Sequence, residues 1–189
     1  MEVLLHIDRV LFLWINHLGN QFVWLDWWMI GISNKWTALP LYVFLSAVLI
    51  KKFGVSSFFW IAVSTIALIV LADQGSVVFF KEVFQRLRPC HEPSLANMIR
   101  LVQENCGGQF GFVSSHSANS FGIASFAFIL LQSISRWYAL LFLWAGVIAI
   151  SRVYLGVHYP SDIIIGALFG IAIGLSLGII TSRSIIKCQ

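Results

Sequence analysis

The sequence predicts an all-α membrane protein that forms a bundle of about six transmembrane helices. Apolar residues make up 59% of the 189-residue chain and charged residues only 11%, and the mean hydropathy is +0.86. These values exclude an ordinary soluble domain and are typical of a protein that crosses the membrane several times. The length suits a single membrane domain over residues 1–189. The net charge of +4 comes from scattered residues, so nucleic-acid binding is not predicted.

The N-terminal segment, residues 1–34, is amphipathic and rich in tryptophan. Apolar residues between Val3 and Ile15 recur at helical spacing, and Trp27 and Trp28 follow. Tryptophan is enriched where a membrane meets water. We expect this segment to cross the membrane once, which brings the total to six crossings. The alternative is a segment that lies only in the membrane interface.

Five further spans follow from hydropathy. We predict them at residues 36–50, 53–72 with a helical continuation to 84, 117–135, 137–155 and 163–181. The basic residues that flank these spans fall on one side, which the positive-inside rule assigns to the cytoplasm: Lys51, Lys52, Arg136, Arg183 and Lys187. Other polar residues then fall together on the opposite side: Lys81, Arg88, His116, Arg152, His158 and Asp162. The sequence therefore predicts a multi-pass protein of the cytoplasmic (inner) membrane with a polar site on its extracytoplasmic face.

The one long loop, residues 85–115, contains two cysteines on the predicted extracytoplasmic side. A disulfide between Cys90 and Cys106 would close a loop of about fifteen residues, which contributes roughly 3 kcal/mol on the chain-entropy estimate. One alternative is a pair of free thiols. Another is a metal site built with His91 and Glu92, but the spacing matches no structural zinc pattern.

The first candidate group of site residues lies at the end of the second of these spans. Lys81 and Arg88 are seven residues apart, which is about two helical turns, so both can face the same way. Two cations on one face suit a dianion, although snorkelling to the interface would also explain them. Asp73, two turns before Lys81, is an ionisable residue inside a span. Its expected role is a counter-ion for one of these cations.

The second group opens the span that follows the long loop. Backbone N–H groups at a helix start bind anions, and the hydroxyls of Ser114 and Ser115 add further donors. His116, next in the chain, can give a proton to a leaving oxygen. The alternative for Ser114 is a simple helix cap.

The third group, between the last two spans, combines Arg152, His158 and Asp162. Pro160 suits the first turn of a new helix, and this places Asp162 close behind His158. A carboxylate beside an imidazole fixes its tautomer and makes it a better nucleophile. The guanidinium of Arg152 is a planar, permanently charged group suited to phosphate.

Taken together, the three groups resemble the signature of the type 2 phosphatidic acid phosphatase family of integral membrane lipid phosphatases. The first part, a lysine, six residues and Arg-Pro, is matched by Lys81, Arg88 and Pro89. The third part, Ser-Arg, five residues, a histidine, three residues and an aspartate, is matched by Ser151, Arg152, His158 and Asp162. The middle part, Pro-Ser-Gly-His, is matched at Ser114 and His116, while Val113 and Ser115 replace its proline and glycine.

This resemblance implies a role for each residue. His158 is the expected nucleophile, Asp162 orients it, and His116 serves first as acid for the leaving group and then as base for water. The expected phosphate-binding residues are Lys81, Arg88, Ser114, Ser115 and Arg152. We expect no metal and no other cofactor, because phosphoryl transfer depends mostly on positioning and charge stabilisation, which three cations can supply.

The predicted function is hydrolysis of a phosphate monoester or diphosphate of a membrane lipid through a phosphohistidine. Candidate substrates are polyprenyl diphosphates such as undecaprenyl diphosphate, phosphatidylglycerophosphate, phosphatidic acid and the phosphates of lipid A. The alternatives are a phosphotransferase that uses the same phosphohistidine and a lipid carrier without activity. The expected partners are the bilayer and the lipid substrate, and the sequence predicts no particular oligomeric state.

Overall fold

The structure is a computed structural model that describes residues 2–103 and 105–187. In this part of the chain the regular elements are helices, and one isolated β-bridge joins Leu87 to Phe110. The α-helices are α1 (Glu2–Gln21), α2 (Trp24–Ser33), α3 (Leu39–Phe53), α4 (Phe58–Ser76), α5 (Glu82–Phe84), α6 (Ser115–Leu131), α7 (Leu140–Tyr154) and α8 (Pro160–Lys187). The predicted all-α fold is confirmed.

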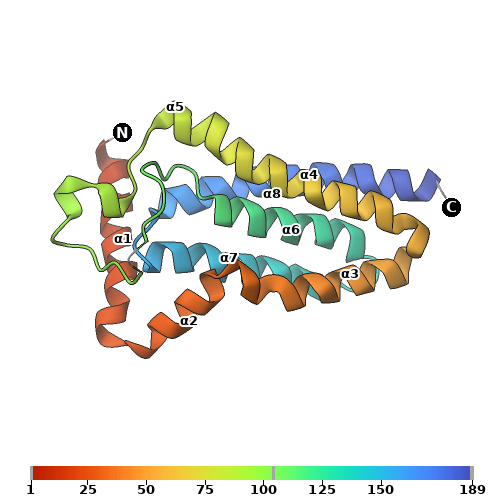
Figure 1. The fold of residues 1–189 in the computed structure, drawn as a ribbon, viewed down its shortest axis with the longest axis horizontal. Helices are drawn as coiled ribbons and strands as arrows, with labels where there is room; N and C mark the ends of the chain where they lie inside the picture. Colours follow the sequence, from red (N-terminus) through yellow and green to blue (C-terminus); the bar gives the residue numbers. More distant parts are fainter. Residues whose placement is uncertain (1, 104, 188–189) are drawn as a thin grey trace.

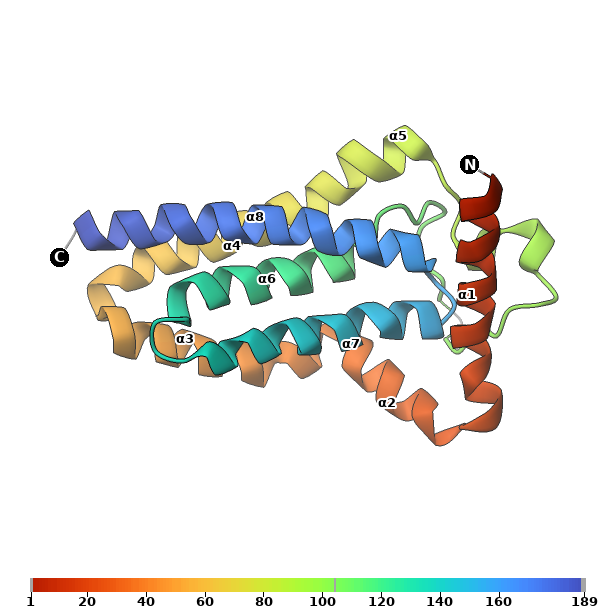
Figure 2. The same ribbon diagram turned by 180° about the vertical axis from the view of Figure 1, so that it is seen from behind.

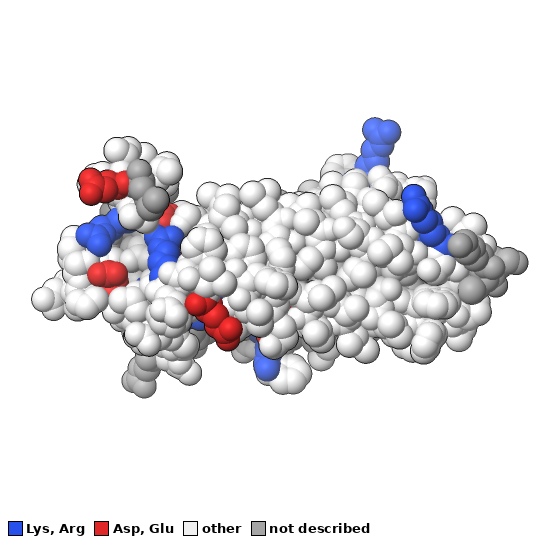
Figure 3. All heavy atoms as spheres, turned by 90° about the horizontal axis from the view of Figure 1, so that it is seen from above, with Lys and Arg blue, Asp and Glu red and all other residues white. Residues whose placement is uncertain are grey.

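The long helices α3, α4, α6, α7 and α8 run roughly alongside one another (Figures 1 and 2). Each corresponds to one of the five spans that hydropathy predicts after the N-terminal segment. Helical stretches long and apolar enough to cross a membrane are Lys35–Phe53, Val55–Phe84, Arg136–Tyr154 and Pro160–Ile186. On the face drawn in Figure 3, charged side chains gather towards the two ends and leave an uncharged stretch between them. Such a surface suits a bundle surrounded by lipid.

Helix α6 lies inside the bundle, where it packs against α4, α7 and α8. Its contact with α8 depends on glycine, because a Cβ on Gly170 would overlap the backbone of Ala118, and one on Gly174 would overlap the backbone of Gly122. Small residues of this kind allow membrane helices to approach closely. The start of α6 is therefore held against the start of α8.

Helix α1 does not run along the bundle but lies across one end of it (Figures 1 and 2). Its buried positions, Asp8, Phe12, Asn16 and Gly19, follow the three- and four-residue spacing of one helix face. The ring of Phe12 packs edge-on against Tyr159, with centroids 5.4 Å apart. This orientation fits the interfacial alternative for the first segment rather than a sixth crossing along the bundle.

The long loop covers the same end of the bundle as α1 and includes two 3-10 turns, Pro89–His91 and Pro93–Leu95. Asn16 of α1 fastens this loop, since its side-chain nitrogen donates to the carbonyl oxygens of Arg100 at 2.7 Å and of Tyr154 at 2.8 Å. Its side-chain oxygen accepts from the backbone N–H of Arg100 at 2.7 Å. The buried side-chain amide of Asn16 thus joins the long loop, α1 and α7.

Candidate active site

His158 and Asp162 meet at the junction between α7 and α8. The chain leaves α7 through Gly156, whose φ of 88° is a conformation that suits glycine, and α8 begins at Pro160. His158 Nδ1 lies 3.4 Å from Asp162 Oδ2, and the backbone N–H of Tyr159 donates to the same oxygen at 2.9 Å. Asp162 therefore holds the Nδ1 proton of His158 and leaves Nε2 unprotonated.

Burial lowers the pKa of His158 to about 4, and its hydrogen bond to Asp162 acts in the opposite direction. The nearby cations Arg88 and Arg152 also disfavour the protonated ring. The imidazole is therefore neutral near pH 7, and a neutral imidazole is the nucleophilic form.

Arg88 faces the other side of the imidazole. Its Nη1 lies 3.4 Å from His158 Nε2 and 3.5 Å from the carbonyl oxygen of Val157. The residue is only 8% exposed, and this burial lowers the pKa of the guanidinium. The chain around Arg88 is fixed by a hydrogen bond from its backbone N–H to the carbonyl oxygen of Gln109 at 3.1 Å.

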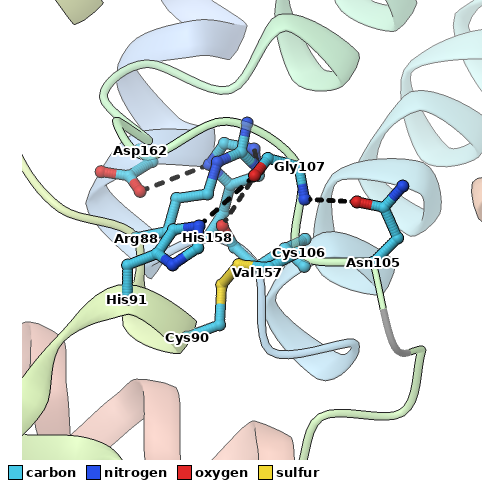
Figure 4. The surroundings of a disulfide bond; sticks show 9 residues. All are labelled: Arg88, Cys90, His91, Asn105, Cys106, Gly107, Val157, His158 and Asp162. Atoms are coloured by element: carbon cyan, nitrogen blue, oxygen red, sulfur yellow. Dashed lines mark hydrogen bonds and ion pairs between the residues drawn. A yellow bond between two sulfur atoms is a disulfide. The ribbon is translucent and has the colours of Figure 1, made fainter.

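A disulfide between Cys90 and Cys106 lies next to Arg88 (Figure 4). It brings the two arms of the loop together, and the backbone of Gly107 passes beside the guanidinium of Arg88. His91 is close enough that ligand atoms of His91 and both cysteines lie within 4.8 Å of one another. The two sulfurs are bonded to each other, however, and a disulfide sulfur is not the thiolate that binds zinc.

The start of α6 contributes Ser114, Ser115 and His116. Ser114 is the N-cap, because its side-chain oxygen accepts from the backbone N–H of Ser117. Its own backbone N–H donates to the carbonyl oxygen of Asp162 at 3.0 Å. The hydroxyl of Ser115 accepts a hydrogen bond of 2.8 Å from Lys81 Nζ.

Lys81 reaches this point from the end of a π-helical stretch, Val77–Lys81, between α4 and α5. Irregular turns of this kind often occur at functional sites. Asp73, one of the predicted site residues, forms no ion pair with Lys81 in the part of the chain that the structure describes. The expected direct counter-ion contact is therefore not present, although both residues line the same cavity.

Arg152, near the end of α7, directs its guanidinium towards the α2–α3 connection, where Nη1 donates to Ser33 Oγ. Within residues 2–103 and 105–187, Nε of Arg88 and Nε of Arg152 are both buried and have no hydrogen-bond partner. These donors are available to an anion. Two guanidinium groups and one ammonium in a partly buried site suit a phosphate group.

The three groups predicted from sequence meet around one cavity of about 830 Å³. The predicted catalytic, phosphate-binding and supporting residues that line it are Asp73, Lys81, Arg88, Ser115, His116, Arg152 and His158. Ser114 and Asp162 lie behind this wall, where they support the backbone and the imidazole respectively. The cavity continues between the helices to Tyr42, Ile69 and Ile123, so it has a polar end and an apolar end, as a lipid with a phosphate headgroup requires.

Sequence reasoning missed several polar residues of this region. Ser33, Lys35 and Asn119 line the cavity, and none of them belongs to a recognisable pattern. Arg86 contacts Asp162 directly, with Nη1 3.0 Å from Oδ1. Its position two residues before Arg88 was the available signal, since a third cation in that stretch needs a partner.

A comparison with protein families matches residues 57–185 to the PAP2 superfamily. The chain belongs to this superfamily. It is 36% identical over 172 residues to a lipid A 4'-phosphatase of Bacteroides thetaiotaomicron, covering 90% of this chain and 75% of the relative. It is 32% identical over 176 residues to a lipid A 4'-phosphatase of Porphyromonas gingivalis, covering 92% and 72%.

Among solved structures, the chain is similar to Aquifex aeolicus LpxE, with a TM-score of 0.59, 26% identity and coverage of 94% of this chain and 95% of that one. The predicted family and enzyme class are confirmed by these relatives. The PAP2 chain described here is a multi-pass membrane lipid phosphatase and thus a phosphoric ester hydrolase.

Proposed function

We propose that this PAP2 enzyme hydrolyses a phosphate monoester of lipid A at the extracytoplasmic face of the cytoplasmic membrane. The observation that supports the chemistry is the placement of His158, with a carboxylate behind Nδ1 and a guanidinium in front of Nε2. The substrate follows from the two relatives named lipid A 4'-phosphatase, each aligned over nine-tenths or more of the chain. A large amphipathic phospholipid also suits a cavity that joins a cationic end to an apolar one.

In the proposed reaction, Nε2 of His158 attacks the phosphorus and the bond from phosphorus to the lipid oxygen breaks. His116, in the first turn of α6, gives a proton to the departing oxygen. Asp162 keeps the Nδ1 proton and stabilises the positive charge that develops on the ring. The products of this step are the dephosphorylated lipid and a phosphohistidine at His158.

In the second step, water attacks the phosphorus and gives a proton to His116. The nitrogen–phosphorus bond breaks, inorganic phosphate leaves and His158 regains its lone pair. Lys81, Arg88 and Arg152 bind the phosphoryl oxygens in both steps and stabilise the negative charge that is spread over these oxygens in the transition state.

The proposed membrane face follows from the arrangement of the helices. Lys51 and Lys52 end α3, Arg136 precedes α7 and Arg183 is near the end of α8. The end of α3, the start of α7 and the end of α8 lie at the end of the bundle away from the α7–α8 junction (Figures 1 and 2). Charged residues at this end are all basic in the described part of the chain, whereas the site end carries acidic as well as basic residues. By the positive-inside rule we assign the first end to the cytoplasm and the site to the opposite face.

The test is phosphate release by the purified full chain in mixed micelles. Lipid A phosphorylated at the 1 or the 4' position is compared with phosphatidylglycerophosphate, phosphatidic acid and undecaprenyl diphosphate. We expect the highest kcat/KM with lipid A, release of free phosphate rather than a phosphorylated acceptor, and loss of turnover and of covalent phosphate labelling in His158→Ala. His6→Ala, at an exposed position of α1, is the matched control.

Each part of the proposal has its own contradicting result. Turnover by His158→Ala at a tenth or more of the wild-type rate would exclude His158 as the nucleophile. A higher kcat/KM for another lipid would reject lipid A as the substrate and leave the chemistry in place. Transfer of labelled phosphate to a second lipid would favour the phosphotransferase alternative.

A further inference from the structure

Arg86 bridges two carboxylates that come from opposite ends of the sequence. Its Nη1 donates to Asp162 Oδ1 at 3.0 Å and its Nη2 donates to Asp8 Oδ2 at 2.6 Å. The side chain of Asp162 is fully buried and that of Asp8 is 8% exposed. Because burying a charge without a partner is costly, a guanidinium that contacts both carboxylates stabilises their burial.

The bridge is fixed on its other sides as well. Ser161 accepts from Arg86 Nη1 at 2.6 Å, donates its backbone N–H to Asp8 Oδ1 at 2.8 Å and donates its hydroxyl to Asp8 Oδ2 at 2.5 Å. The guanidinium carbon of Arg86 lies 4.0 Å from the ring centroid of Tyr159, which is a cation–π contact. Arg86 is thus held in one orientation by α1 and by the first turn of α8.

The two oxygens of Asp162 have separate partners. Oδ1 accepts from Arg86, whereas Oδ2 lies against Nδ1 of His158 and the backbone N–H of Tyr159. Rotation of the carboxylate would break both sets of contacts. The contact of Arg86 with Oδ1 therefore fixes the orientation of the carboxylate, and this orientation determines how Oδ2 contacts His158.

We propose that Arg86 and Asp8 are positioning residues of the active site, which act on His158 through the carboxylate of Asp162. Neither residue lines the cavity, so neither touches the phosphate. Helix α1, which lies outside the matched family region of residues 57–185, thereby contributes to the reaction. The inference rests on the proposed role of His158 as the nucleophile.

The charges around the bridge set the direction of the expected effects. Asp162 is faced by Arg86 and His158, with Lys81 and Arg88 farther off, and His158 is faced by Asp162, Arg88, Arg152 and His116. Removal of Arg86 leaves the full charge of Asp162 acting on the imidazole. Removal of the charge on Asp8 has the opposite effect, because Arg86 then neutralises Asp162 more completely.

The test compares Arg86→Gln, Arg86→Lys, Asp8→Asn and the double variant Asp8→Asn/Arg86→Gln. We expect Arg86→Gln to lower kcat by about 10- to 100-fold with KM changed less than about threefold, since misplacement of a catalytic group costs up to about 100-fold. Arg86→Lys retains the charge and restores part of the rate. Asp8→Asn lowers kcat less, and the double variant is no slower than Arg86→Gln alone because both changes act through one contact.

The matched control is Asp26→Asn. Asp26 in α2 also forms a salt bridge to an arginine of the long loop, Arg100, but this pair does not touch Asp162. We expect Asp26→Asn to lower the thermal stability without changing kcat of the folded protein. A fall in kcat with Asp26→Asn as large as that with Arg86→Gln would show that both pairs only maintain the fold.

Titration of histidine by nitrogen NMR provides a readout that needs no turnover. In Arg86→Gln we expect the pKa of His158 to rise by about 0.5 to 1 unit, and in Asp8→Asn we expect it to fall. Unchanged values, or shifts in the same direction, would overturn the positioning role. If His158→Ala retained activity while these shifts were observed, the proposed nucleophile would be wrong and the coupling of Arg86 to His158 would stand.

Discussion

At the residue scale, the environment of His158 explains why one histidine among five in the chain suits nucleophilic attack. It is 2% exposed and its ring is held between Asp162 and Arg88. Burial keeps the ring neutral, the carboxylate selects the tautomer, and the guanidinium of Arg88 lies beside Nε2, where the proposed reaction places a phosphoryl oxygen. Neutrality alone is not sufficient, because a neutral ring with the other tautomer would present the Nε2 N–H to the cavity instead of a lone pair.

The low pKa of His158 predicts a stability that depends on pH. The folded pKa is about 4 and the ordinary value is 6.5, so between these values the unfolded chain binds more protons than the folded one. The contribution of this residue to stability is complete above pH 6.5 and is lost as the pH falls towards 4. We expect the melting temperature in detergent to fall between about pH 7 and pH 5, and to fall less in His158→Asn. Equal slopes for both proteins would contradict this assignment.

The individual site residues were recognisable from sequence because their chemistry demands particular side chains at fixed spacing. His158 and Asp162, four residues apart around a proline, imply one turn of a helix and hence a contact. Arg86 was not singled out, because its role depends on Asp8, which is 78 residues earlier in the chain. The basic stretch around Arg88 indicates that Arg86 needs a partner, but no local pattern identifies a partner so distant in the chain.

At the scale of elements, the site is a meeting of helix ends. The first turns of α6 and α8 are joined by a hydrogen bond from the backbone of Ser114 to that of Asp162, and the glycines of α8 let the two helices approach closely. The span predicted at residues 117–135 begins at Ser115 in the structure. Its polar first turn was hard to assign to a membrane helix because it faces the cavity rather than lipid.

The disulfide between Cys90 and Cys106 is expected to hold the loop that supports Arg88. We expect the variant Cys90→Ser/Cys106→Ser to lower kcat/KM about tenfold, because Arg88 loses the support of the chain beside it. Stability should fall by about 3 kcal/mol at most, the chain-entropy value for a loop closed by two cysteines 16 positions apart. Phosphate release and thermal melting measure the two effects, with Cys188→Ser as the control. Unchanged values in the double variant would show that Arg88 is held by other contacts.

At the scale of the whole molecule, the bundle separates two chemical environments. Lipid surrounds the apolar helices, while α1, the long loop and the helix starts gather polar groups at one end (Figures 1 and 2). A lipid substrate can keep its acyl chains in the bilayer while its phosphate enters the cavity at headgroup depth. The amphipathic α1, lying across that end, suits the membrane interface.

The proposed orientation can be measured with cysteines at the two ends. In a Cys188→Ser background, in which Cys90 and Cys106 are bonded to each other, one cysteine is placed at Asn97 in the long loop or at Gln132 after α6, both of which are exposed. We expect a thiol reagent that cannot cross the membrane to label Asn97→Cys in intact cells and to label Gln132→Cys only after lysis. The reverse result would place the active site on the cytoplasmic face.

The sequence by itself determined the class of fold, the five long helices and most of the polar residues that line the proposed site. Hydropathy and residue spacing are local properties, and a lipid environment requires apolar helices wherever the chain crosses it. Only the tertiary structure decided that α1 lies across the end of the bundle, that Arg152 meets Ser33 and that Arg86 joins Asp8 to Asp162. These features depend on contacts between distant segments, which form only when the helices pack and buried charges find their partners.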